Sequence, residues 1–304
     1  MTYKTISEII YKLKIMEKQT ILVTGATGAT GAPTVELLMQ KGYPVRAFVH
    51  KEDERSTSLK VLGAEIFVGD LHDMEDVRAA WKGIKRGYFC YPLSPNLLDA
   101  TVMFAQAAKE AGAELIVNLS QKQVASTVKS PATIRHFLSE ETFNWSGIPT
   151  VHLRATFFSE WFLYVSAAIK AGKLQMAFPE RARHAPVAGE DLARTIVAIL
   201  DEPEQHVGKA YQLFGPEELT YTEIGEIFSR ALGKNIVYEQ VSIQEMADII
   251  GLGESDHFKN HVAHVISDHL FASPHMNDRI RTITGKDPMK LAEFIGKNRA
   301  AFEA

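Results

Sequence analysis

The glycine-rich segment 24–31, T-G-A-T-G-A-T-G, constrains the fold more than any other part of the chain. It stands between an apolar run at 20–24 and a segment whose apolar residues recur at helical spacing. Gly25 permits a tight turn, Gly28 lets the backbone approach a pyrophosphate, and Gly31 lets the helix pack close to the strand. The start of that helix would present free N–H groups to a phosphate. The spacing predicts a dinucleotide loop, with a glycine-rich turn that binds nothing as the alternative.

Six residues of this loop are predicted to contact the cofactor, and they are Gly25, Thr27, Gly28, Ala29, Thr30 and Gly31. No Gly-Lys-Ser or Gly-Lys-Thr follows the glycines, which excludes a Walker-type nucleotide loop. The position of the loop, at the first junction between a strand and a helix, strengthens the prediction because a glycine triplet alone is weakly specific.

The rest of the chain alternates between short β-rich runs and longer helical stretches, which predicts βαβ units. The β-rich runs are 20–25, 44–50, 64–71, 87–93, 114–120 and 149–155. The expected class is α/β, a Rossmann-type doubly wound parallel sheet with helices on both faces. After residue 155 the pattern turns helix-rich, with helices predicted at 157–172, 190–200 and 220–233, strands at 209–215 and 235–241, and mostly helix over 243–304.

These patterns divide the chain into an appendage at 1–18, an NAD(P)-binding domain at 19–155 and a smaller C-terminal substrate lobe at 156–304, which returns segments to the sheet. The net charge of -4 over 304 residues argues against a nucleic-acid binder. The single cysteine, Cys90, excludes a disulfide framework and a thiolate zinc finger. No run approaches the roughly 20 apolar residues of a membrane helix, so a cytoplasmic protein is expected.

The end of the second β-rich run indicates which dinucleotide is used. An acid there would bind the ribose 2′-hydroxyl of NAD, whereas a cation accommodates the 2′-phosphate of NADP. His50 and Lys51 stand at this position, and acids follow only at 52 and 53. NADP(H) is therefore preferred, with NAD(H) as the alternative cofactor and Lys51 as a mere surface charge in that case. Asp70, next to Leu71, is predicted either to bind the adenine amino group or to cap its own loop.

Several segments together form a pattern more specific than the glycine loop. They are 24–31, G-D-L at 69–71, Ser120, S-G-I-P-T-V-H-L-R at 146–154, G-K-A-Y-Q-L-F-G-P-E-E-L-T-Y-T-E-I at 208–224 and T-G-K-D-P-M-K-L-A-E-F at 284–294. The pattern resembles the atypical short-chain dehydrogenases of the NmrA-like family over about residues 20–302. It is most similar to the branch of triphenylmethane-dye reductases, NADPH quinone reductases of the second type and azoreductase-like proteins. The resemblance implies a Rossmann domain followed by a small substrate lobe.

One departure from ordinary short-chain dehydrogenases affects the chemistry. Those enzymes use a Tyr-x-x-x-Lys pair, and alignment on the 146–149 segment places Ala132 at the tyrosine position and His136 at the lysine position. His136 is a candidate to contact the nicotinamide ribose or lend a proton, with Glu140 one turn later as its orienting carboxylate; a surface histidine is the alternative. Ser120, at the carboxyl edge of the fifth strand, is a candidate for a polar contact with a ligand.

The resemblance also suggests walls around the nicotinamide. The predicted residues are Tyr91, Pro92, Leu93, Ala155, Thr156 and Phe157. An aromatic stripe made of Phe157, Phe158, Trp161, Phe162 and Tyr164 is expected to be partly core and partly the wall of a pocket for a flat substrate.

Five histidines cluster near the C-terminus, at 257, 261, 264, 269 and 275. The first three recur on one helical face, a spacing that could bind zinc. No carboxylate or thiolate completes such a site, so no metal is predicted. A satisfied or surface histidine face is expected, with substrate contact as the alternative.

These observations predict an NADPH-dependent reductase of quinones, azo dyes or other conjugated aromatic acceptors. Such acceptors delocalise the product anion, so the missing tyrosine is tolerable. The alternative is a non-catalytic NADP(H)-binding redox sensor with a regulatory protein partner, since the family that the chain resembles contains both kinds. A small aromatic or conjugated substrate is the expected partner, no nucleic acid or membrane is expected, and a homodimer is left open.

Overall fold

The computed structural model describes residues 18–267 and 276–303, and its centre is a seven-stranded sheet. The strand order within these residues is β3-β2-β1-β4-β5-β6-β9, and every neighbouring pair is parallel. The strands are β1 (Ile21–Val23), β2 (Val45–Val49), β3 (Glu65–Val68), β4 (Arg86–Phe89), β5 (Leu115–Gln121), β6 (Thr150–Ala155) and β9 (Ala210–Leu213). The order reverses between β1 and β4, which confirms the predicted doubly wound sheet.

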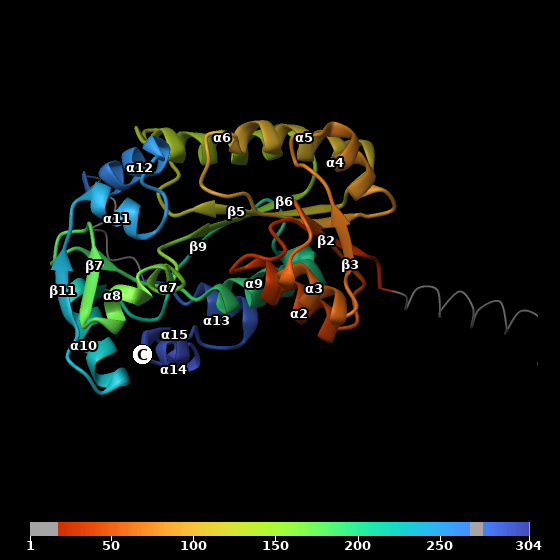
Figure 1. Cartoon of the computed structure of the whole chain (residues 1–304). Coiled ribbons are helices and arrows are strands. Elements are labelled where there is room, and N and C mark those ends of the chain that lie inside the picture. The colour runs from red at the N-terminus through yellow and green to blue at the C-terminus, as the bar shows by residue number, and fades with distance from the viewer. Residues whose placement is uncertain (1–17, 268–275, 304) are drawn as a thin grey trace, which may run out of the picture.

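Helices cover both faces of this sheet (Figure 1). One layer consists of α4 (Met74–Trp81), α5 (Leu97–Glu110) and α6 (Pro131–Ser146). The opposite layer consists of α2 (Gly31–Gln40), α3 (Glu54–Val61), α9 (Gly189–Asp201) and α13 (Arg279–Thr284). Successive strand residues point to opposite faces, so Ile21 and Val23 join one buried core and Leu22 joins the other. The sheet is therefore buried on both sides, as parallel sheets require.

A second group of elements packs around its own aromatic core at one end of the sheet (Figure 1). Its helices are α7 (Trp161–Tyr164), α8 (Ser166–Lys170), α10 (Tyr221–Leu232), α11 (Ile243–Ile249), α12 (Asp256–Ser267), α14 (Leu291–Lys297) and α15 (Arg299–Phe302). Its strand pairs are β7 (Lys173–Met176) with β11 (Val237–Gln240), and β8 (Arg183–His184) with β10 (Leu219–Thr220). A 3-10 turn covers Pro203–Gln205. Phe162, Phe228 and Phe302 are fully buried in this core.

Several elements differ from the sequence predictions, and the short strands β7, β8 and β10 were not predicted at all. The single helix expected over 157–172 is instead two short helices: Phe158 forms a β-bridge with Val187, so α7 begins only at Trp161, and Val165 separates α7 from α8. Helix α3 was not predicted, since Leu59 is its one buried apolar side chain and its start depends on a capping box between Asp53 and Ser56. The predicted helix at 220–233 is confirmed, with Thr220 as its N-cap and Gly233 ending it in the left-handed conformation.

Some predictions concern residues outside the described part of the chain. These are most of the appendage at 1–18, except Lys18, together with His269 and His275. Among the residues that are described, no helix has the length and apolar character needed to cross a membrane.

Candidate functional site

The glycine loop lies at the point where the strand order reverses, and each of its glycines has a different task. Gly25 has a φ of +57°, a backbone conformation that favours glycine. A Cβ on Gly31 would collide with the carbonyl oxygen of Gly25, so only glycine lets α2 begin this close to the loop. A Cβ on Gly28 would meet only that same oxygen, at 3.2 Å. The loop is thus held tightly at both ends and has more room at its centre.

Threonine side chains fix this loop to the neighbouring strand. The Thr24 hydroxyl lies 3.1 Å from the carbonyl oxygen of Cys90 and accepts the Cys90 N–H at 2.9 Å. The Thr30 hydroxyl lies 2.8 Å from the Tyr88 hydroxyl and is buried, so this predicted cofactor contact can be made only by the Thr30 backbone. Helix α2 has no acidic residue in its first turn, so no side-chain carboxylate there offsets the positive end of its dipole.

A pocket of about 460 Å³, here called the loop pocket, lies beside the glycine loop at the carboxyl ends of β1 to β4. It brings together predicted residues that are far apart in the sequence. The predicted residues that line it are Gly25, Thr27, His50, Asp70, Leu71, Tyr91 and Pro92. Lys51 is exposed next to His50 and is not among the lining residues.

Two acids near the loop pocket, Asp53 and Asp70, have partners within the protein. Asp53 caps helix α3 and forms an ion pair with Arg55 at 2.6 Å, so it is not a free partner for a ribose hydroxyl. Asp70 accepts the backbone N–H of His72 at 2.9 Å, and this hydrogen bond lowers the pKa of the Asp70 carboxyl. Asp70 therefore caps its own loop, the second of the two roles predicted for it, while it also lines the pocket.

A second pocket of about 130 Å³, here called the aromatic pocket, lies at the ends of β5 and β6. Phe157 stacks on Trp161, with ring centroids 6.2 Å apart, and Trp161 stacks on Phe258 of α12 at 5.9 Å. Of the predicted nicotinamide walls, the residues that line it are Leu93, Ala155, Thr156 and Phe157. Trp161, from the predicted aromatic stripe, and His261, for which substrate contact was the alternative, also line it. The remaining lining residues were not predicted, and they are Gln121, Gln123, Phe178, Met246, Phe258, Val262 and Val265.

The aromatic stripe divides between pocket and core as expected. Phe157 and Trp161 line the aromatic pocket, Phe162 is fully buried in the core of the lobe, and Phe158 packs against the sheet. Tyr164 is 61% exposed. Apart from His261, the lining residues from α11 and α12 were not predicted, because they meet the stripe only through the tertiary fold.

Unpartnered buried polar atoms lie at the end of β5. The Ser120 hydroxyl is buried, and among the described residues it has no hydrogen-bond partner. The Nε2 atom of Gln121 has no partner in that same part of the chain, while its Oε1 accepts the Thr133 hydroxyl at 3.4 Å. Buried polar atoms are rarely left unpaired in native proteins, so these atoms fit a site that receives a polar ligand.

His136 lies on α6 and faces helix α12 rather than a carboxylate. Burial, together with His261 and His257, lowers the pKa of His136 to about 3. Glu140 does not orient this histidine as predicted: its carboxylate binds the Arg154 guanidinium at 2.6 and 3.0 Å, because a permanent cation on β6 competes for it successfully. His136 is therefore neutral at pH 7. Neither of the two predicted catalytic residues, His136 and Ser120, is among the residues that line the loop pocket or the aromatic pocket.

The three described C-terminal histidines lie on α12. Within residues 18–267 and 276–303, no group of three or more His, Cys, Asp or Glu side chains is arranged to hold a metal ion. His261 instead lines the aromatic pocket, and its Nδ1 lies 3.2 Å from the Ser130 hydroxyl. It is thus neither a surface histidine nor a member of a metal cluster.

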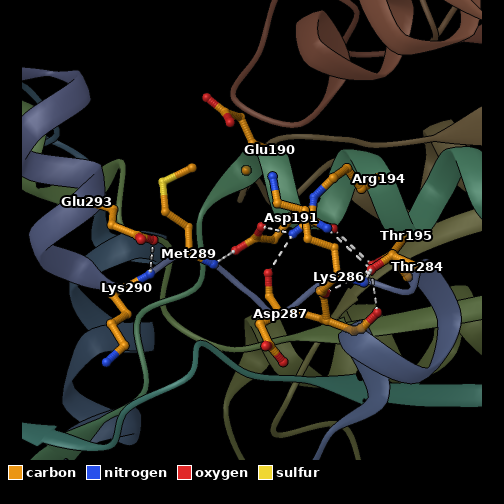
Figure 2. A network of polar contacts seen from close by, with 12 residues as sticks. Glu190, Asp191, Arg194, Thr195, Thr284, Lys286, Asp287, Met289, Lys290 and Glu293 are labelled. Atoms are coloured by element: carbon orange, nitrogen blue, oxygen red, sulfur yellow. Dashed lines mark hydrogen bonds and ion pairs between the residues drawn. The ribbon is translucent and has the colours of Figure 1, made fainter.

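Below the glycine loop, a network of polar contacts holds the segment that follows α13 (Figure 2). The buried Asp191 carboxylate pairs with Arg194 and accepts the Met289 N–H at 2.7 Å. Arg194 also donates to the Thr284 hydroxyl and to the Asp287 carbonyl. The segment thereby becomes one wall of a groove of about 1090 Å³, whose opposite wall includes Thr27, Gly28 and Ala29. Residues of the 284–294 motif thus attach the segment after α13 to Asp191 and Arg194 of α9.

A doubly wound parallel sheet, with a glycine loop at its switch point and pockets along the carboxyl edge, defines a Rossmann-type α/β protein. The chain belongs to the NmrA-like family, whose model matches residues 17–295. The resemblance noted in the sequence is thereby confirmed.

Individual relatives cover nearly the whole chain. An NAD(P)H azoreductase from Xenophilus azovorans is 27% identical over 93% of this chain and 99% of its own length. An NADPH-dependent quinone oxidoreductase from Escherichia coli, solved with NADPH, has a TM-score of 0.78 at 22% identity and covers 92% of this chain and 99% of its own. The Citrobacter sp. triphenylmethane reductase, solved with NADP(H), has a TM-score of 0.75 at 23% identity over 91% and 99% of the two chains. The negative transcriptional regulator NmrA, solved with NADP, has a TM-score of 0.72 at 19% identity over 93% and 95%.

Proposed function

We propose that the protein is a reductase that uses NADPH to reduce quinones, azo compounds or other conjugated aromatic acceptors. The observation that carries this proposal is the position of the aromatic pocket. It lies at the ends of β5 and β6, and the residues expected to back a nicotinamide, among them Ala155 and Thr156, form part of its wall. A flat acceptor held against Trp161 would therefore lie beside the reactive ring of the cofactor.

The residues present fit a dinucleotide along the edge of the sheet. The glycine loop would hold the pyrophosphate, His50 and Leu71 would flank the adenosine, and the unpaired Ser120 hydroxyl would bind a polar group of the nicotinamide nucleotide. Asp53 is engaged by Arg55 and the α3 backbone. The surroundings expected for the 2′-position of the adenosine ribose therefore favour NADP(H), and Lys51 would be the cation that binds the 2′-phosphate. Bound NADPH supplies a hydride to the acceptor.

The contribution of the chain is to orient the acceptor and to exclude water. Ala132 stands where a catalytic tyrosine would lie, so this site offers no tyrosinate for alcohol–ketone chemistry. A conjugated acceptor spreads its new charge over the ring system and needs less acid assistance than a simple ketone. The stacked rings of Phe157, Trp161 and Phe258 give a dry, flat surface suited to such a molecule.

The names of the relatives support the same class of acceptor, because they include an azoreductase, a quinone oxidoreductase and a triphenylmethane reductase. The similarity to a transcriptional regulator solved with NADP is the observation that supports a redox sensor as a second candidate. The composition, with Cys90 as the single cysteine, supports a cytoplasmic location for either function.

The test uses the purified full chain. Calorimetry measures the affinity for NADPH and NADH, and absorbance follows NADPH oxidation with a quinone, an azo dye and a triphenylmethane dye, with cyclohexanone as the negative control. We expect tighter binding of NADPH than of NADH and turnover with at least one conjugated acceptor. Tight NADPH binding without turnover of any acceptor would contradict the reductase and favour the sensor. Absence of NADPH binding would contradict both.

A further inference from the structure

His261 occupies a distinctive position among the residues that line the aromatic pocket. It comes from α12, which covers the pocket from the side of the lobe and packs along α6 (Figure 1). The wall around it is mostly apolar, with Phe258, Val262 and Val265 contributed by the same helix. An imidazole in such a wall is a specific polar contact for one atom of a bound ligand.

The contact between Ser130 and His261 is compatible with a tautomer that carries its proton at Nε2. Ser130 is the N-cap of α6, and its buried hydroxyl oxygen accepts the Thr133 N–H at 3.4 Å. The hydroxyl proton is therefore available to the Nδ1 atom of His261, 3.2 Å away. A neutral imidazole that accepts a hydrogen bond at Nδ1 carries its own proton at Nε2. When Ser130 donates in this contact, Nε2 is the donor atom of His261.

The surroundings of His261 keep it neutral at physiological pH. Burial is the main cause that lowers the pKa of His261 to about 4, and His257 and His264 on the same helix lower it further. His136 on α6 faces these α12 histidines, and the charge of Arg135 on α6 lowers the pKa of His257. His261 is therefore a hydrogen-bond donor at neutral pH and not a charged acid.

We infer that the Nε2–H of His261 donates a hydrogen bond to the reducible heteroatom of the acceptor, a quinone oxygen or an azo nitrogen. This inference rests on the proposed function, because it assigns the acceptor to the aromatic pocket. The acceptor gains a hydride from NADPH, which is oxidised to NADP⁺, and its heteroatom then takes one proton from water. The imidazole keeps its own proton and stabilises the negative charge while it is present.

The first experiment measures binding to the cofactor-free full chain, so it does not depend on turnover. 1,4-Naphthoquinone and naphthalene have similar shapes, but only the quinone accepts a hydrogen bond. Quenching of tryptophan fluorescence reports both affinities, since Trp161 lies in the wall. We expect the wild-type protein to prefer the quinone by about two- to tenfold, as one net hydrogen bond would give. His261→Phe keeps an aromatic wall and should abolish the preference, whereas His261→Gln, which retains an N–H donor, should keep part of it.

His264→Phe is the matched control, because His264 lies one turn later on α12 and does not line the aromatic pocket. This variant should keep the full quinone preference. A preference that persists in His261→Phe would overturn the inference while leaving the reductase intact. Failure of the wild-type protein to bind either probe would instead refute the acceptor site on which the inference rests.

The second experiment measures the wild-type protein, and a variant is used only to assign the signal of one histidine. Nitrogen-15 NMR of the histidine-labelled wild-type protein, assigned by comparison with His261→Phe, reports which ring nitrogen carries the proton. We expect the signal of an Nε2-protonated neutral ring at pH 7. A ring protonated at Nδ1 or doubly protonated at that pH would refute the inference, because the donor would then be absent or differently placed.

Discussion

Replacing Glu160 by glutamine should stabilise the protein above neutral pH and have almost no effect at acidic pH. Glu160 lies between the glycine loop and α9, where its Oε1 accepts the Gly189 N–H at 2.8 Å. Its Oε2 is buried, and no hydrogen-bond partner for it occurs in the described residues. Burial is the main cause that raises the pKa of Glu160 from 4.5 to about 7. The native fold therefore disfavours the ionised carboxylate, even though it uses one of its oxygens.

The magnitude follows from the two pKa values. Between about pH 4.5 and pH 7 the folded protein binds more protons at this site than the unfolded chain, so stability falls as the pH rises through that window. The difference between the two pKa values corresponds to a loss of about 3 kcal/mol that is fully present only above pH 7. Glutamine is neutral at every pH and its oxygen can still accept the Gly189 N–H, so Glu160→Gln should remove this loss.

Urea unfolding at a series of pH values, from about 4 to 8.5, measures the effect as the difference in unfolding free energy between variant and wild type. The difference should grow from near zero at the acidic end to a gain for the variant at the alkaline end. Glu36→Gln, which removes an exposed carboxylate from the same groove, is the control and should show no such slope. A Glu160→Gln difference that is constant across the series, or a variant less stable than wild type above pH 7, would refute the reasoning.

Three further predictions concern the cofactor. Gly28→Val should abolish NADPH binding measured by calorimetry, because the valine side chain would occupy the pyrophosphate position. Circular dichroism should show an intact fold, since the added Cβ meets only the Gly25 carbonyl inside the protein. Unchanged affinity for NADPH would exclude a pyrophosphate at this loop. Lys51→Ala should weaken the binding of NADPH by about 1.5–3 kcal/mol and leave the binding of NADH unaffected. An equal loss of affinity for both cofactors, or no loss for either, would mean that Lys51 is only a surface charge. His136→Ala should leave the pH profile of turnover unchanged near pH 6–7, since His136 has a pKa of about 3; a flattened profile would show that it does supply a proton.

Local patterns in the sequence were sufficient for the sheet and the glycine loop. The roles of Gly25 and Gly31 follow from their spacing, and the β-rich runs are short apolar or β-branched segments between longer helical stretches. The helix predicted over 157–172 does not begin at residue 157, because Phe158 pairs with Val187, a contact that no local pattern contains. Helix α3 was missed because a capping box rather than an apolar face defines its start.

The candidate site was predictable on the side of the sheet and not on the side of the lobe. Asp70 and Phe157 follow strands directly, so strand order places them at the edge. His261 and Phe258 reach the aromatic pocket, which Phe157 also lines, only because α12 packs over α6, and that placement depends on contacts across half of the chain. The pairing of Glu140 with Arg154 is similarly non-local, which is why the orienting role predicted for Glu140 was wrong.

Strand β9, at the edge of the seven-stranded sheet, affects how the protein folds during synthesis and where its chain can be truncated. Strand β9 pairs in parallel with β6, yet it is synthesised only after α7, α8 and α9. Until then, a growing chain on the ribosome exposes the backbone N–H and C=O groups of β6 as an open edge, which can pair with other chains. A fragment that ends at residue 155 would keep this edge permanently and would also lack the cover that α9 gives to the sheet. The dinucleotide-binding part of the sequence is therefore expected to aggregate when expressed alone.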